Sequence, residues 1–129
     1  MQVPLQVILN EAVANGVGTP INVGMFNTVM LQVGSTNSGA CVLKVQGSIS
    51  NDVPAFGTAA SVTNHWDYVE TYDLMSATEL VGDTGLTFSG TDANNIRNLM
   101  VNVANLKWIN VEVSGYSAGK VTVKAAVHQ

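Results

Sequence analysis

Few side chains in this sequence could carry out acid–base or nucleophilic chemistry. The histidines are His65, which precedes Trp66 and Asp67, and His128, the penultimate residue. Serines are abundant, but spacing alone does not join any of them to a histidine and an acid in a catalytic triad. The one cysteine, Cys41, stands in an alternating apolar run, where we expect a small buried side chain and no disulfide. The sequence therefore predicts no catalytic residue and a protein that is not an enzyme.

The acidic residues are scattered and form no metal-binding pattern. A calcium loop needs several oxygen ligands at close spacing, whereas the turns at 82–85 and 90–95 each supply one acid. A zinc site is not expected either, because the single cysteine is distant in sequence from both histidines. Neither a P-loop nor a G-x-G-x-x-G motif is present. We therefore expect no metal, nucleotide or other cofactor.

Aromatic side chains are the clearest candidates for binding. Trp66, Tyr68 and Tyr72 alternate along one run, so an extended backbone would place them on one face. That face is either a platform for a sugar or a partner subunit, or a cover over the edge and core of the fold. In an extended backbone Trp108 points to the opposite side from Ile109, the apolar residue that follows it. Tyr116 stands between glycines in a short loop. These five aromatic residues are candidate contact residues.

The composition indicates one globular domain over residues 1–129. Hydrophobic residues make up 47% of the chain and charged residues only 11%, whereas typical domains carry about a quarter charged residues. The net charge is −4, and no cluster of lysine and arginine is present that could bind nucleic acid or a membrane surface. We therefore expect neither partner, and a weakly charged surface that suits contact with other proteins.

The N-terminal run MQVPLQVILNEAV lacks the charged and apolar regions of a secretory signal. No apolar stretch approaches the roughly 20 residues that span a bilayer, so we expect synthesis in the cytoplasm. Val3, Leu5 and Val7 alternate in this run and are candidate interface residues. Residues 1–12 could pair with the sheet edge of a neighbouring molecule as an exchanged or docking strand.

Hydrophobic residues recur with a period of two, which is typical of antiparallel strands with one solvated face. Valine dominates the apolar positions, in agreement with strand preference. The segments 34–39 and 114–119 are expected to be the corners of two hairpins, because glycine flanks each of them. The expected inward-facing residues are Val29, Leu31, Val33, Cys41, Leu43, Val45, Ile49, Leu99, Val101, Val103, Ile109, Val111, Val113, Val121, Val123, Ala125 and Val127.

Weaker signals indicate further strands between these runs. We expect them, separated by turns rich in Gly, Asn and Asp, at about 3–9, 19–24, 65–73, 79–82 and 85–89. Thr91 or Asp92 could cap a short helical turn, and the segment from about 50 to 64 is the longest irregular stretch. The pattern predicts an all-β fold, a single-domain antiparallel β-sandwich of jelly-roll or Ig-like type with about eight or nine strands.

Several motifs together resemble a group of small virion proteins of tailed bacteriophages. The chain has Q-G-S at 46–48, W-x-Y-V at 66–69 and G-x-T-G-[LI] at 82–86. It also has N-x-x-x-[LM]-K-[WY]-[IV] from Asn102, which leads to S-x-Y-[ST]-x-G-x-V-x-V ending at Val123. The resemblance extends over about residues 43–126.

The resemblance implies a structural role in a phage particle, on a sandwich of this type. Within that class we expect a capsid decoration, or cement, protein on the outer capsid surface, which bridges neighbouring subunits of the major capsid protein and forms a homotrimer. An alternative is a tail, neck or head-fibre component that presents the aromatic residues to a host receptor or glycan. Loss of capsid stability after removal of the protein would favour the first, and loss of host adsorption the second.

Overall fold

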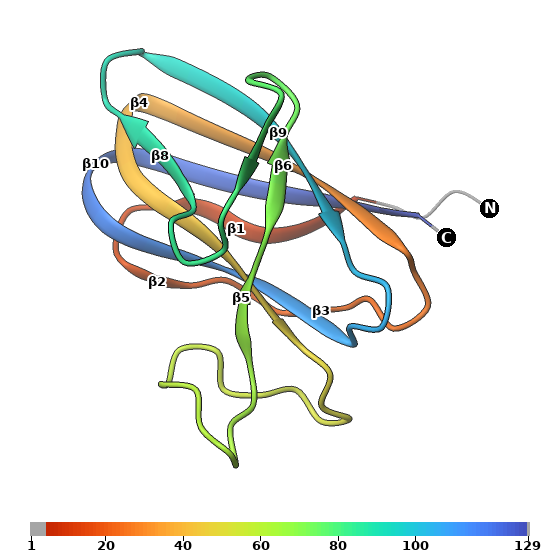
Figure 1. Ribbon diagram of the computed structural model, residues 1–129. Helices are drawn as coiled ribbons and strands as arrows, with labels where there is room; N and C mark the ends of the chain where they lie inside the picture. Colours follow the sequence, from red (N-terminus) through yellow and green to blue (C-terminus); the bar gives the residue numbers. More distant parts are fainter. Residues whose placement is uncertain (1–4, 129) are drawn as a thin grey trace.

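The computed structural model describes residues 5–128, which form an antiparallel all-β fold without a helix. No helix long and apolar enough to cross a membrane occurs in this part of the chain. The strands form one open sheet that folds over into a sandwich (Figure 1). They are β1 (Gln6–Ala12), β2 (Gly16–Val17), β3 (Ile21–Asn22), β4 (Thr28–Ser48), β5 (Asp67–Val69), β6 (Thr71–Asp73), β7 (Thr78–Leu80), β8 (Leu86–Ser89), β9 (Asn94–Asn102) and β10 (Trp108–His128).

The predicted fold class is confirmed, but two strands are much longer than expected. β4 and β10 contain 21 residues each and pair with each other from Trp108↔Ser48 to His128↔Thr28. The segments predicted as hairpin corners are instead bends within these strands, marked by register shifts between Ser114 and Lys120. The prediction of two hairpins was therefore wrong, because the alternating pattern is the same whether a strand turns back or bends and continues.

Glycine makes the bend possible at the place where the two paired long strands approach each other most closely. Gly119 has φ +79, and a Cβ atom there would lie 2.4 Å from the Cα of Gly39 in β4. Any larger residue would force the two backbones apart, which explains the glycine at this position. The bend gives each long strand one half in each layer of the sandwich.

We name the two layers after strands that belong to only one of them. The β9 layer runs in the order β1, second half of β10, first half of β4, β9, β6 and β7. The β5 layer contains β2 and β3, which pair with the first half of β10, and β5 and β8, which pair with the second half of β4. The layers are therefore continuous through the bends of the two long strands.

The core lies between the layers and consists mostly of the predicted alternating residues. Leu31, Val101 and Val123 of the β9 layer and Ile109 and Val111 of the β5 layer are fully or almost fully buried. Their positions confirm the period-two interpretation, and facing apolar side chains supply the main driving force for folding. Cys41 is also buried, as predicted.

Two local predictions were wrong. Ile49 is exposed because β4 ends at Ser48, so alternation no longer directs its side chain inward. Residues 91–93 form no helical turn; β9 begins at Asn94, and the amide of Ser38 donates to the carbonyl of Ala93 at 3.1 Å. Pairing with β4 across the sheet decides the conformation of this segment instead of a local cap.

The N-terminal strand is part of the sandwich. β1 pairs with β10 of its own chain, with register shifts between Val7 and Leu9 and between Leu9 and Ala12. Ile8 and Leu9 are buried in the core, whereas Leu5 and Val7 are exposed. Val3 lies outside the described residues, as does the start of the proposed docking strand at 1–12.

Candidate functional site

The segment 50–66 projects below the sandwich (Figure 1), and its Phe56 lies over Gln46 on the outer side of the β5 layer. Phe56, Trp66 and Tyr68 pack together there; the Phe56 and Trp66 rings are 6.3 Å apart and the Trp66 and Tyr68 rings 5.2 Å apart, the latter edge to face. Beneath them Gln46 points away from the core yet is completely buried, and its Nε2 donates to the carbonyl of Phe56 at 2.9 Å. We call this surface the covered face.

Asn64 holds the projecting segment in one conformation. Its Oδ1 accepts from the amide of Ala55 at 2.8 Å, and its Nδ2 donates to the carbonyl of Ala55 at 2.9 Å and of Ala59 at 3.2 Å. Trp66 Nε1 donates to the carbonyl of Thr58 at 2.9 Å. Bonds from these two side chains therefore supplement the few backbone hydrogen bonds of this segment, which is how an irregular stretch can be ordered.

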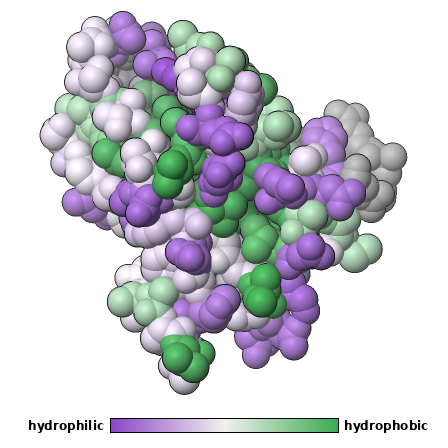
Figure 2. Space-filling model, in the orientation of Figure 1, coloured by the Kyte–Doolittle hydropathy of each residue, from purple (hydrophilic) through white to green (hydrophobic). Residues whose placement is uncertain are grey.

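The end of this ordered segment is uncharged and consists mainly of small residues. Residues 53–66 contain no Asp, Glu, Lys or Arg, and the side chain of Val62 is 97% exposed. Figure 2 shows hydrophobic surface at the lower end of the projection. An ordered, uncharged projection loses little conformational entropy on binding, so it suits contact with another protein.

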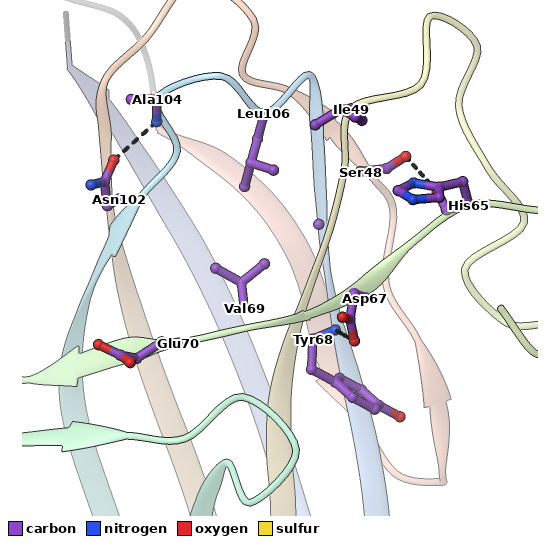
Figure 3. A pocket seen from close by; sticks show the side chains of 11 residues that line it. Ser48, Ile49, His65, Asp67, Tyr68, Val69, Glu70, Asn102, Ala104 and Leu106 are labelled. Carbon is purple, nitrogen blue, oxygen red and sulfur yellow. Dashed lines mark hydrogen bonds between the residues drawn. The ribbon is translucent and has the colours of Figure 1, made fainter.

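A groove lies where this segment leaves the sandwich, between β5 and the turn that follows β9. Its volume is about 570 Å³. Val69 and Leu106 point into it from opposite sides, and Asp67, Glu70 and His65 lie around them (Figure 3). Its lining combines an apolar floor with two carboxylates and no lysine or arginine.

Val69 and Leu106 can pack over residue 47 in the floor of the groove because this residue is a glycine. A Cβ atom at Gly47 would lie 2.6 Å from Cγ2 of Val69 and 3.0 Å from Cδ1 of Leu106. Ser48 Oγ beside it donates to the carbonyl of His65 at 2.5 Å, which fixes the rim. Within residues 5–128 no group of three or more His, Cys, Asp and Glu is placed to hold a metal ion.

Tyr68 links the covered face to both long strands. Its hydroxyl donates to the Glu112 carboxylate at 3.0 and 3.1 Å, and Nζ of Lys44 lies 5.0 Å from the centre of its ring. Burial and the bond to Glu112 raise the pKa of the Tyr68 hydroxyl. The cation and the carboxylate therefore hold this ring against the sheet as part of the cover.

The other candidate aromatic residues lie apart from this cluster. Trp108 is half-buried and its Nε1 donates to the carbonyl of Asn51 at 3.4 Å. Tyr116 packs against the core at the bend, and its hydroxyl donates to the carbonyl of Gly119 at 2.7 Å. Tyr72 pairs with Met100 in the β9 layer. The structure brings Trp66 and Tyr68 together but joins the five to no common platform.

Residues 115–119, GYSAG, match the G-x-S-x-G pattern of a nucleophile elbow, a match that the sequence reasoning passed over. That elbow requires a turn from a strand into a helix, whereas here the segment is the bend inside β10. His65 lies near Ser48, whose cross-strand partner is Trp108. Trp108 is nine residues from Ser117, the serine of the motif, which is roughly 30 Å along an extended chain. The motif is therefore part of the bend in β10 and not a nucleophile elbow.

Sequence reasoning also missed the ion pair that holds the β6–β7 turn. Asp73 is buried and accepts from the guanidinium of Arg97 in β9, from Ser76 Oγ at 2.9 Å and from the amide of Met75 at 3.1 Å. Burial alone would raise the pKa of Asp73, but these hydrogen bonds outweigh it and lower the pKa. Alternation gives no sign of this pair, because its residues lie on strands distant in sequence.

The outer surface of the β9 layer differs from the covered face, since no described segment lies over it. We call it the open face. Met100 and Ile96 of β9 are 41% and 62% exposed on it. Its main residues are Met30, Tyr72, Ile96, Met100, Lys124 and Ala126.

Comparison with known proteins shows what this fold is similar to. No protein-family model and no curated protein matches the sequence. The structure is similar to the crystal structure of YomS, a protein derived from the SPBc2 prophage, with a TM-score of 0.64 and 13% identity over 96% of this chain and 90% of that chain. The K3 cleaved adhesin domain of Lys-gingipain from Porphyromonas gingivalis w83 gives a TM-score of 0.44 and 12% identity over 95% of this chain and 69% of that one. The likeness to YomS establishes a shared fold.

Proposed function

We propose that this protein is a non-enzymatic structural protein of a tailed-phage particle, which decorates and stabilises the capsid by bridging neighbouring subunits of the major capsid protein. The observation that carries the proposal is the likeness in fold to a prophage-derived protein, over 96% of this chain. The phage-type motifs at 46–48, 66–69 and 82–86 support it independently of the fold.

The projecting segment 50–66 is the surface that we expect to contact the shell. Residues 53–66 of it contain no Asp, Glu, Lys or Arg, Asn64 holds it and Val62 is exposed, and pre-organised surfaces bind without a large ordering cost. The buried Cys41 and the placement of GYSAG within a strand support a non-enzymatic role. Burial raises the pKa of the Cys41 thiol, which keeps it protonated and unreactive.

Shells assembled without this chain provide the test. Purified protein added to such shells should bind them and raise the temperature at which they break open. Val62→Lys places a charge at the tip of the contact and should abolish most of this rescue, whereas Val81→Lys, at an exposed apolar position outside the segment, should not. Absence of binding, together with loss of host adsorption in particles that lack the protein, would instead place it in the tail, neck or head fibre.

A further inference from the structure

The open face carries a row of apolar side chains across four strands. Ala126 of β10, Met30 of β4 and Met100 of β9 are consecutive cross-strand partners, and Met100 pairs with Tyr72 of β6. Cross-strand partners in an antiparallel sheet point to the same side. Val29, Leu31, Leu99 and Val101 beside them are buried, so the row faces away from the core.

Such a row is unusual for the solvated side of an antiparallel sheet, which is normally polar. Met30 is half-buried, and Met100 and Ile96 are 41% and 62% exposed. Gly34, the cross-strand partner of Ile96, leaves a shallow hollow of about 260 Å³ beside it, between Thr122 and Lys124. The polar row of Lys124, Gln32 and Asn98 separates Ile96 and the hollow from the row of Met30 and Met100. The candidate contact is therefore the methionine row itself, and methionine adapts well to a partner surface.

The open face is large enough for a specific protein interface. β9 has nine residues, which at about 3.4 Å each gives a length of roughly 30 Å. Six strands form the layer, and at about 4.8 Å between neighbours they span roughly 24 Å. Because β6 and β7 contain only three residues each, the face measures on the order of 550 Å², or about 1,100 Å² for two copies, which is at the lower end of specific interfaces.

Charge is arranged on opposite sides of the apolar row. Lys124 of β10 is exposed on one side and Glu79 of β7, the partner of Tyr72, is exposed on the other. Neither side chain is in an ion pair within residues 5–128. The centre, formed by Met30 and Met100, is uncharged. A two-fold rotation about an axis that passes between Met30 and Met100 places the basic side of one copy against the acidic side of the other.

From these observations we infer that the open face binds a second copy of this chain in a two-fold pair. In the pair Met30 packs on Met100 of the second copy near the axis, and Lys124 lies toward the Glu79 side of the second copy. The same patch serves both copies, as a two-fold interface requires. The segment 50–66, on the opposite layer, stays outside the contact in each copy and so remains free to bind.

The sheet edges are poor alternatives for self-association. β1 has two register shifts, and β7 contains only three residues. Bulged and very short edge strands offer few aligned backbone groups, so they hinder the addition of another strand. The face therefore provides the better contact, and the two-fold pair differs in stoichiometry from the trimer that the resemblance implies.

The molar mass of the purified full chain, measured by light scattering over a range of concentrations, tests the pair. The wild type should show the mass of two 13.5 kDa chains. Met100→Lys buries a charge at the axis and should weaken pairing at least about 100-fold, whereas Val62→Lys should pair like the wild type. Lys124→Glu and Glu79→Lys should each weaken pairing about tenfold, and their combination should restore it.

Three results would overturn the inference. They are a single-chain mass at every concentration, a three-chain mass, and a pair that survives Met100→Lys. Failure of the double charge exchange to restore pairing would also contradict the two-fold arrangement, and this result does not depend on whether Met100→Lys folds. Shell binding is measured separately, so the proposed function and the pair can fail independently.

Discussion

On the covered face, Gln46 is buried although it points away from the core, because Phe56 and the rest of the segment 50–66 lie over it. On the open face, Met30 and Met100 also point away from the core but have no cover within residues 5–128. The same chain thus buries a polar residue on one face and leaves one methionine half-buried and another exposed on the other. The difference indicates that the covered face contributes to stability and the open face to association.

The largest effect on stability is expected at Phe56, in the middle of the cover. Phe56→Ala should lower the free energy of unfolding by about 3–4 kcal/mol, because it removes a buried ring and leaves a cavity above Gln46. Urea denaturation measures this change. Val62→Ala in the same segment is the matched control and should change it by less than about 0.5 kcal/mol. Equal effects of the two variants on the free energy of unfolding would contradict the claim that Phe56 forms a stabilising cover over Gln46.

A smaller loss is expected at Asn64, which holds the same segment. Asn64→Ala removes the hydrogen bonds to Ala55 and Ala59, so it should lower the free energy of unfolding by about 2 kcal/mol. Hydrogen exchange at the Ala55 amide should become faster, while that at the Val123 amide should change only with global stability. Unchanged exchange at Ala55 would mean that other contacts order the segment.

A pH-dependent effect is expected from Asp73, which supports the edge of the open face. Because the folded-state pKa of Asp73 is lowered, its contribution is present above the unfolded pKa of about 4 and is lost as the pH falls through the folded value. Asp73→Asn should therefore lower stability at pH 7 and make it less sensitive to acid. A variant whose acid unfolding matches the wild type would contradict this account.

The smallest effect on folding is expected on the open face. Met100→Lys should change the free energy of unfolding of the single chain by less than about 0.5 kcal/mol, since an exposed side chain contributes little to the core. Denaturation at concentrations too low for pairing measures it. A loss comparable to that of Phe56→Ala would show that Met100 belongs to the core of its own chain.

Much of the fold was predictable because alternation reports which side of a strand is buried. Val121 and Val123 were correctly placed in the core, although the structure sets them across the core from Val111 and Val113 and not beside them in a hairpin. Alternation carries no information on which strands pair or where a strand bends. The bend needed Gly119, whose role depends on Gly39, a residue distant in sequence.

The candidate sites were less predictable, for a related reason. Trp66 and Tyr68 were placed correctly on one face, but their partners Phe56 and Glu112 come from other parts of the chain. The open face was not predicted at all, because Met30 and Met100 occupy positions that the alternating pattern assigns to solvent. Only the pairing of β4 with β9 brings the two methionines together.

Cross-linking at the axis tests the central claim most directly. Packed sheets lie about 10 Å apart, so a thiol introduced by Met100→Cys should lie within reach of the same thiol of a second copy for a short bis-maleimide. Wild-type protein, with Cys41 buried, and Val62→Cys serve as controls. We predict that Met100→Cys is captured mostly as a covalent pair while both controls remain single chains. Capture of Met100→Cys no faster than Val62→Cys would contradict the claim that the open face binds a second copy.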